Sequence, residues 1–233
     1  MFLNASKISC GYDKTKIVEN CNIFLKKGQI ASIVGPNGAG KSTAMKAIFG
    51  LLPLYEGNVF FNNENISKLK PQERVLKGMS FVPQTNNIFQ SMTVEENLEM
   101  GGFIRENGIK ETINQVYDLF PILKDKKKQV AENLSGGQRQ QLAFGRALMT
   151  KPNFLMLDEP SAGVSPIVME DLFKKIIDIS RQGVSILMVE QNAKQALKIS
   201  DIGFVLNQGK NKFTDSGKNL LSNSEVRESF LGG

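Results

Sequence analysis

The chain has 233 residues, 41% of them hydrophobic, and a formal net charge of +6 because 29 lysine and arginine residues outnumber 23 acidic residues. It contains no histidine, which excludes histidine metal sites, histidine general bases and imidazole pH switches. The two cysteines, Cys10 and Cys21, lack metal-ligand spacing, the first residues lack the apolar core of a signal peptide, and no stretch approaches the roughly 20 apolar residues that cross a bilayer, so we expect a cytoplasmic protein.

Two kinds of strand pattern predict two sheets. Residues 4–29 contain short alternating segments separated by turn residues, and residues 57–63 repeat this pattern, which is typical of a small antiparallel sheet. Apolar runs at residues 30–34, 154–157, 186–189 and 202–206 alternate with helical stretches and indicate a parallel sheet with crossover helices. The predicted fold class is therefore α/β.

The middle of the chain is predicted to be helical. From Thr93 to about Thr150 the apolar residues recur at helical spacing, most clearly at residues 94–100 and 110–120. We expect one domain, 1–233, with a core from residues 1–84 and 151–233 and an inserted helical subdomain from about 85 to 150. The basic run from Lys124 to Lys128 contains no aromatic residue, so we interpret it as a solvated loop rather than a nucleic-acid patch.

The strand at residues 30–34 leads into a glycine-rich loop and then a helix. This order is the context that the pattern G-x-x-x-x-G-K-[ST] requires, because glycines turn successive N–H groups inward and the helix adds its positive dipole end. Lys41 can reach the β- and γ-phosphates, and the Ser42 hydroxyl can bind Mg²⁺. A structural glycine turn is the alternative. The predicted nucleotide-binding residues of this loop are Gly35, Pro36, Asn37, Gly38, Ala39, Gly40, Lys41, Ser42 and Thr43.

Two acids follow the apolar run at residues 154–157. Adjacent residues on a strand point to opposite sides, so Asp158 and Glu159 cannot share one task. Asp158 suits the Mg²⁺ shell, and Glu159 is placed to polarise a water for attack on the γ-phosphate. The alternative is that the pair caps a helix N-terminus.

A second glycine pair stands before the amphipathic stretch that ends near Met149. Ser135 is a good N-cap residue, and capping alone explains its position. Two glycines at a helix N-terminus also expose N–H donors to an anion. We infer that this helix start caps a γ-phosphate held by the loop of a second copy. The residues predicted to do so are Ser135, Gly136, Gly137 and Gln138.

Leu134-Ser-Gly-Gly-Gln138, the phosphate loop, Gln84 after an apolar strand and the Asp158-Glu159 pair together resemble the ATP-binding subunit of an ABC transporter. The resemblance covers nearly the whole chain in the right order. It implies a P-loop NTPase core of the RecA-like type, and two such domains that pack head to tail around two ATP molecules with Mg²⁺.

The same resemblance assigns roles to residues outside the phosphate loop. Tyr12 would stack on adenine, Gln84 would contact Mg²⁺ and the attacking water, and the segment from Thr85 to about Ile104 would meet the membrane subunits. The alternatives are that Tyr12 is a turn aromatic and Gln84 a polar residue at a strand end.

Gln191 stands where this family usually has a histidine that contacts the γ-phosphate. A glutamine side chain can donate and accept hydrogen bonds, but it has no titratable proton. We therefore expect a hydrogen-bonding γ-phosphate sensor, with Glu159 as the strong candidate for the base. The alternative is that Gln191 only caps the following helix through its backbone region, although glutamine is a poor capping residue.

The stretches VEQNAKQAL, LAFGRALM and VRESFLGG resemble the LivF-type ATPases of branched-chain amino acid importers and of related amide and urea importers. This implies transmembrane permease subunits, a periplasmic binding protein, a homologous ATPase or a second copy as partners, and a location on the inner face of the cell membrane. Val164 departs from the aspartate that many ABC ATPases carry. The alternatives are another transporter ATPase, for amide, urea or lipid, or a soluble ATPase in cofactor assembly.

Overall fold

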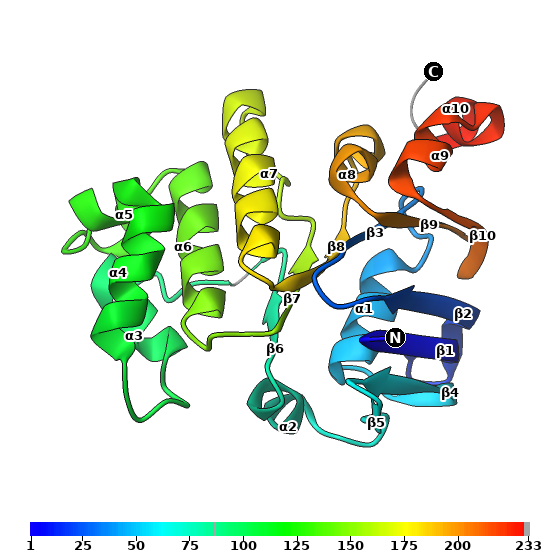
Figure 1. Ribbon diagram of the computed structural model, residues 1–233, viewed down its shortest axis with the longest axis horizontal. Helices are drawn as coiled ribbons and strands as arrows, with labels where there is room; N and C mark the ends of the chain where they lie inside the picture. Colours follow the sequence, from blue (N-terminus) through cyan, green and yellow to red (C-terminus); the bar gives the residue numbers. More distant parts are fainter. Residues whose placement is uncertain (86, 231–233) are drawn as a thin grey trace.

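The computed structural model describes residues 1–85 and 87–230. Figure 1 shows two sheets on one side of the molecule and a group of helices, α3 to α6, on the other, with α7 between them. The two parts are built from different stretches of sequence, because the helices follow one another in the middle of the chain and most strands lie before or after them.

The larger sheet has six strands in the order β10-β9-β3-β8-β7-β6. The pairs β9-β3, β3-β8, β8-β7 and β7-β6 are parallel, and only β10 runs antiparallel. The α/β class and the mainly parallel sheet are therefore confirmed. The strands are β3 (Ile30–Val34), β6 (Met79–Val82), β7 (Phe154–Asp158), β8 (Ser185–Val189), β9 (Ile202–Asn207) and β10 (Lys210–Asp215).

The smaller sheet is antiparallel, with the order β2-β1-β4-β5. Asp13, in the turn between β1 and β2, has a φ of 52°, the left-handed conformation that aspartate tolerates in turns. β4 begins three residues before the predicted start at residue 57, because the chain already pairs with β1 at Leu54. The strands are β1 (Leu3–Tyr12), β2 (Thr15–Leu25), β4 (Leu54–Phe61) and β5 (Glu64–Asn65).

Helix α1 (Lys41–Phe49) lies in the core between the two sheets. Its buried residues include Ala44, Met45 and Ile48, which join one hydrophobic cluster with residues of β1, β3, β7 and β8. Seven of its nine residues are buried, so the position of the helix is fixed from all sides. The loop before α1 is fixed with it.

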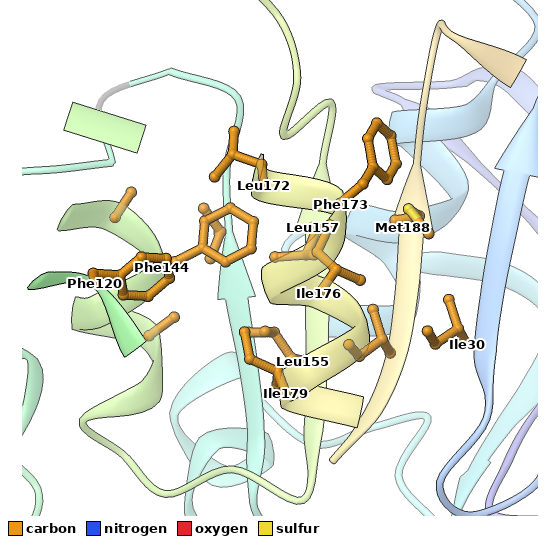
Figure 2. Packing of buried hydrophobic residues seen from close by; sticks show 14 of the residues in the cluster. Ile30, Phe120, Phe144, Leu155, Leu157, Leu172, Phe173, Ile176, Ile179 and Met188 are labelled. Atoms are coloured by element: carbon orange, nitrogen blue, oxygen red, sulfur yellow. The ribbon is translucent and has the colours of Figure 1, made fainter. Parts of the chain in front are cut away.

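The other face of the large sheet is covered over β7 and β8 by α7 (Pro166–Arg181), and residues of α8, α9 and α10 complete the same hydrophobic cluster. Leu172, Phe173, Ile176 and Ile179 recur at helical spacing, and Figure 2 shows them over Leu155, Leu157 and Met188 of the sheet. The strands alternate, because Leu155 and Leu157 face this cluster whereas Phe154 and Met156 face the α1 side.

Helices occupy most of the region from Thr93 to Thr150. Residues 94–100 and 110–120, which were predicted to be helical, correspond to the first two helices of this group. The helices are α3 (Val94–Gly101), α4 (Ile109–Leu119), α5 (Pro121–Asp125) and α6 (Gly136–Leu148), with a 3₁₀ turn at Ala131–Asn133. Whether they form a separate subdomain stays a prediction.

The remaining helices are short. They are α2 (Pro71–Leu76), α8 (Ala193–Ile199), α9 (Gly217–Ser222) and α10 (Ser224–Phe230). Across residues 1–85 and 87–230, no helix combines the length and apolar character needed to cross a membrane.

Both cysteines are free and buried. Burial raises the pKa of the Cys10 thiol to about 11 and that of Cys21 to about 12. Because the thiolate is the reactive form, these side chains act as small apolar core residues rather than as nucleophiles.

Arg74, on α2, is 1% exposed, and its guanidinium caps the C-terminus of helix α1. Its Nη1 donates to the carbonyl oxygens of Ala47 and Ile48, in the last turn of α1, and Nε donates to Leu69 O at 3.0 Å. Burial lowers the pKa of this guanidinium to about 10, so it is still charged at neutral pH. One side chain thereby supplies a donor to Ile48 O at the helix C-terminus and a second donor to Ala47 O, which also accepts from Gly50 N at 3.0 Å.

Replacing Arg74 by Met should therefore destabilise the protein. The variant leaves several buried carbonyl oxygens without donors, which should lower the free energy of unfolding by about 3 kcal/mol. Chemical denaturation of R74M measures this loss. The matched control is R181M, because the Arg181 side chain is 77% exposed. Equal denaturation midpoints for the two variants would contradict this account of Arg74.

Candidate functional site

The loop from Gly35 to Gly40 connects the carboxyl end of β3 to α1. Gly40 has a φ of 90°, in the left-handed region, and a Cβ there would lie 2.9 Å from Val18 Cγ2. Gly35 lies against β9, where a Cβ would come within 2.1 Å of Leu206 O. A Cβ on Gly38 would meet no atom within 4 Å, so the loop is tightly seated on one side and open on the other.

Lys41 begins α1 and is 5% exposed. Its Nζ donates to Gly35 O at 2.9 Å and to Pro36 O at 3.0 Å, so the side chain folds back over the loop. Burial lowers the pKa of Lys41, and the nearby carboxylates of Glu159 and Asp158 oppose this shift. The charge therefore lies at the centre of the loop, where an anion would be attracted.

Ser42 and Asp158 meet at the start of α1 and the end of β7. Ser42 Oγ donates to Asp158 Oδ1 at 2.6 Å, and Asp158 is 3% exposed. These hard oxygen ligands suit Mg²⁺ when phosphate oxygens complete the shell. Among residues 1–85 and 87–230, no group of three or more Cys, Asp or Glu residues could hold a metal by itself.

Glu159 lies just beyond β7 and has a φ of 49°. Its N–H donates to Val189 O at 2.9 Å, so the backbone turns left-handed immediately after the strand. The divergence of Asp158 and Glu159 therefore comes from this turn as well as from strand alternation. The helix-cap alternative is wrong, because α7 begins at Pro166 and Ser165 occupies its N-cap position.

Gln84 follows β6 and lies beside Glu159. Its Nε2 donates to Glu159 Oε2 at 2.9 Å, although the two residues are 75 positions apart. The parallel pairing of Val82 with Leu157 explains this contact, since it brings the ends of β6 and β7 together. The structure thus joins Gln84 to the candidate base, and its role at Mg²⁺ stays a prediction.

Gln191 reaches the loop from the end of β8. Its Nε2 donates to Asn37 Oδ1 at 3.3 Å. Asn192 supplies the N-cap side chain of α8, since it accepts from Gln195 N, so any capping by Gln191 is through its backbone, as the alternative states. Gln191 contributes only its backbone carbonyl, which accepts from Ala193 N at 2.9 Å.

Most of these residues line one open pocket of 570 Å³, whereas the predicted residues Gly35, Pro36 and Asp158 lie outside its lining. Tyr12, at the end of β1 and 46% exposed, forms one side of the pocket together with the aliphatic residue Ile17. Ile17 was not predicted, and its place in an alternating strand gives no signal for it. The lining residues are Tyr12, Ile17, Asn37, Gly38, Ala39, Gly40, Lys41, Ser42, Thr43, Gln84, Glu159 and Gln191. A larger groove of 780 Å³, between α4 and α7, contains none of the predicted site residues.

The predicted residues Ser135 to Gln138 do not line this pocket. They begin α6, where Gln138 Oε1 accepts from Ser135 N at 3.0 Å and Ser135 Oγ accepts from Gln138 N at 3.4 Å, a capping box. A Cβ on Gly137 would lie 2.7 Å from Val168 Cγ1, so close packing against α7 also requires glycine there. The capping interpretation is thus correct, and the phosphate role stays a prediction.

The segment predicted to meet membrane subunits runs from Thr85 to about Ile104, and its residue Asn86 lies outside the described residues. Arg146 of α6 anchors this segment, because its Nη1 donates to Asn87 O and its guanidinium lies 4.3 Å from the Phe89 ring centroid. Four large apolar side chains are exposed along it, namely Phe89, Met100, Phe103 and Ile104. The predicted match at VRESFLGG ends at residues 231–233, which also lie outside the described part.

Comparisons with known proteins agree with this geometry. Residues 18–162 match the family described as ABC transporter. The chain is 40% identical to the high-affinity branched-chain amino acid transport ATP-binding protein BraG of Pseudomonas aeruginosa, over 99% of this chain and 100% of that protein. It is 39% identical to the probable branched-chain amino acid transport ATP-binding protein LivF of Archaeoglobus fulgidus, over 99% and 98%.

A solved structure shares the fold over its whole length. It is the ADP conformation of an ATP-binding cassette of an ABC transporter, with a TM-score of 0.89 and 30% identity over 100% of this chain and 99% of that one. The RecA-like arrangement predicted for the core is thereby confirmed.

Gly40 offers a test of the pocket. In G40A the left-handed backbone and the contact with Val18 should distort the loop, and we expect binding of a fluorescent ATP analogue to weaken about tenfold, equivalent to 1 to 2 kcal/mol of strain. The control is G28A, because Gly28 has a φ of 76° but a Cβ there meets no atom within 4 Å. Equal affinity in the two variants would contradict the seating of this loop.

Proposed function

This chain belongs to the ABC transporter family, and on that premise we propose that it is the ATP-binding, ATP-hydrolysing subunit that energises an importer of branched-chain or other hydrophobic amino acids. The family's ATPase activity follows from membership. The substrate class is supported by two relatives that match almost the full chain and carry this transport in their names. The pocket lined by Lys41, Ser42 and Glu159, with Asp158 bonded to Ser42 at its edge, carries the enzymatic part of the proposal.

Nucleotide binding uses the loop and the aromatic side of the pocket. Tyr12 stacks on the adenine, and the N–H groups from Gly38 to Thr43 surround the phosphates, since the first turn of α1 has no intrahelical partners for them. Lys41 places its positive charge between the β- and γ-phosphates. The same side chain also holds the loop through its bonds to the carbonyls of Gly35 and Pro36.

Metal binding uses Ser42 and Asp158, with Gln84 as a further oxygen ligand. When bound, Mg²⁺ supplies neutralisation of the charge on the phosphate oxygens. Ser42 and Asp158 are held by α1 and β7, two buried elements, so their oxygens keep the 2.6 Å relationship without rearrangement of the core. Gln84 joins this group from a more exposed position after β6.

Hydrolysis uses Glu159 as the base. Its carboxylate accepts a proton from a water that attacks the γ-phosphorus, while the bond from that phosphorus to the β–γ bridging oxygen breaks and ADP leaves. Gln84, within 2.9 Å of that carboxylate, orients the same water. Gln191 contacts the γ-phosphate through hydrogen bonds from the other side of the loop. Because Gln191 does not titrate, the proton remains with Glu159.

The active unit needs a second ATPase chain. Ser135, Gly136, Gly137 and Gln138 lie at the start of α6 and outside the 570 Å³ pocket of their own chain. A head-to-tail partner, either a second copy or a homologous ATPase, would bring its own helix start to the γ-phosphate. This supports a dimer with two shared sites.

The membrane subunits are proposed to dock on the segment from Thr85 to about Ile104, through its exposed apolar residues Phe89, Met100, Phe103 and Ile104. The bond of Arg146 to Asn87 O links this segment to α6, and Gln84, which directly precedes the segment, is bonded to Glu159. In this arrangement the chain lies in the cytoplasm, on the inner face of the cell membrane, with a periplasmic binding protein in the same system and no nucleic-acid partner. Amide, urea and lipid transport and cofactor assembly receive less support. The two relatives named for branched-chain amino acid transport are 39–40% identical to this chain, whereas full-length relatives named for lipopolysaccharide export are only 29–30% identical.

Glu159→Gln should separate binding from hydrolysis. The amide keeps the size of the side chain but accepts no proton, so we expect unchanged affinity for Mg-ATP and turnover lowered by about a hundredfold or more. Phosphate release measures turnover, and E228Q, an exposed carboxylate on α10, is the control.

In the same E159Q preparation, Mg-ATP should convert monomers to dimers in analytical sedimentation. If the variant turns over normally, the base assignment is refuted. If it remains monomeric with ATP, this chain does not pair with itself, and sedimentation with a homologous ATPase subunit tests the heterodimer.

Co-expression with branched-chain amino acid permease subunits tests the transport role. We expect the chain to sediment with membranes only when the permease is present, and F103D to lose this association because the Phe103 side chain is 81% exposed in the proposed docking surface. The control is F60D, an exposed phenylalanine on β4. If membranes retain none of the wild-type chain, the proposed importer role fails while the ATPase activity stands.

A further inference from the structure

Glu190 is a buried carboxylate between β8 and Gln191. It is 1% exposed, and none of the roles proposed above uses it. Its N–H donates to Ile33 O at 3.2 Å, which continues the alignment of β8 with β3 for one residue beyond the strand. A buried carboxylate without a cation beside it is costly unless hydrogen-bond donors surround it. The groups that donate hydrogen bonds to the Glu190 carboxylate therefore show which parts of the structure it holds.

Those donors come from two different loops. Glu190 Oε1 accepts from Ser161 N at 2.9 Å, and Oε2 accepts from Ser161 Oγ at 2.9 Å and from Gln191 N at 3.1 Å. Burial raises the pKa of Glu190, and the bonds from Ser161 oppose this rise. One carboxylate thus fastens the loop after β7 to the loop after β8 through charge-assisted hydrogen bonds.

The fastened loop carries Glu159. Ser161 stands two residues after it, and Ala162 N donates to Glu159 O at 3.0 Å, which closes a tight turn. The left-handed backbone of Glu159 costs about 1 to 2 kcal/mol, so neighbouring contacts must hold it. The hydrogen bond from Glu159 N to Val189 O holds it directly. The two hydrogen bonds from Ser161 to the Glu190 carboxylate hold the loop that follows.

Glu190 also lies within the electrostatic field of the pocket. Burial lowers the pKa of Lys41, and three nearby carboxylates oppose this shift. The effect of Glu190 is the smallest of the three, behind those of Glu159 and Asp158. The Glu190 carboxylate also holds the backbone N–H of Gln191, whose side chain reaches Asn37 in the phosphate loop. Glu190 therefore contacts the backbone of both loops that flank the phosphate end of the pocket.

We propose that Glu190 is a positioning residue for hydrolysis: by binding Ser161 and the Gln191 backbone, it orients Glu159 and Gln191 toward the γ-phosphate. This rests on the proposed function, because it assumes that Glu159 is the base. In this role Glu190 acts through Ser161 and Gln191 and does not touch the substrate. The alternative is that Glu190 only stabilises the fold.

The two possibilities differ in kinetics. A positioning role predicts a fall in kcat with little change in nucleotide affinity, because the phosphate loop is held independently by α1. In E190A we expect kcat to fall about tenfold or more while the Kd of a fluorescent ATP analogue changes less than about threefold. E190Q should recover much of kcat, because its amide oxygen can accept from Ser161 N and its amide nitrogen can donate to Ser161 Oγ.

The hydroxyl of Ser161 supplies a double-mutant cycle. S161A should lower kcat in the same direction, and S161A with E190A together should be no slower than E190A alone, because E190A already removes the Ser161 Oγ bond that S161A removes. The control is D201A, which removes a carboxylate that accepts from Ile30 N at 2.8 Å at the opposite end of β3. It should change the melting temperature without changing kcat.

The outcomes separate this inference from the proposed function. Wild-type protein that hydrolyses ATP, with E190A at wild-type kcat or with additive effects in the cycle, overturns the positioning role alone. Equal losses in E190A and D201A also overturn it, because they indicate a general effect on stability. If E190A fails to fold, E190Q and S161A decide, and wild-type kcat in S161A counts against the proposal. Wild-type protein without hydrolysis overturns the proposed function and this inference together.

Discussion

The parallel register of three adjacent strands, β3, β8 and β7, is the constraint on which the site depends. Ile33 pairs with Val189, and Val189 pairs with Asp158, so the carboxyl ends of these strands are level. Loops that leave a parallel sheet at the same edge must meet there. The phosphate loop, Gln191 and the acidic pair are therefore neighbours, although Asn37 and Gln191 are 154 positions apart in the sequence. A slip of one residue in any of these pairings would turn a functional side chain to the wrong face.

The sequence predicted the parts of the protein in which local pattern and tertiary position agree. The apolar run of β7 is buried on both sides, so its composition alone marks it, and the glycines around Lys41 have a spacing that few other structures need. β10 escaped prediction because it lies at the edge of the sheet and carries mostly polar residues. The bond between Gln84 and Glu159 depends on pairing between distant strands, which no local pattern encodes.

Two further features of the site were outside the reach of sequence patterns. The left-handed backbone of Glu159 is imposed by its neighbours, since glutamate has no intrinsic preference for that conformation. In the sequence, Glu190 is an ordinary charged residue after a strand. Only its burial and its hydrogen bonds from Ser161 indicate that it positions the loops of the site. By contrast, the capping box at Ser135 was predictable from type and spacing, because its partners lie three residues apart.

The buried cysteines have a practical consequence for following motion in this protein. Cys10 and Cys21 are enclosed in the core, and their raised pKa values keep them as thiols at neutral pH. A cysteine introduced at an exposed position would therefore be the preferred target of a maleimide dye or spin label. Pairs of such labels, one on the helical group and one on the sheets, would report the distance between these two parts. The native cysteines would contribute little labelling and could be left in place.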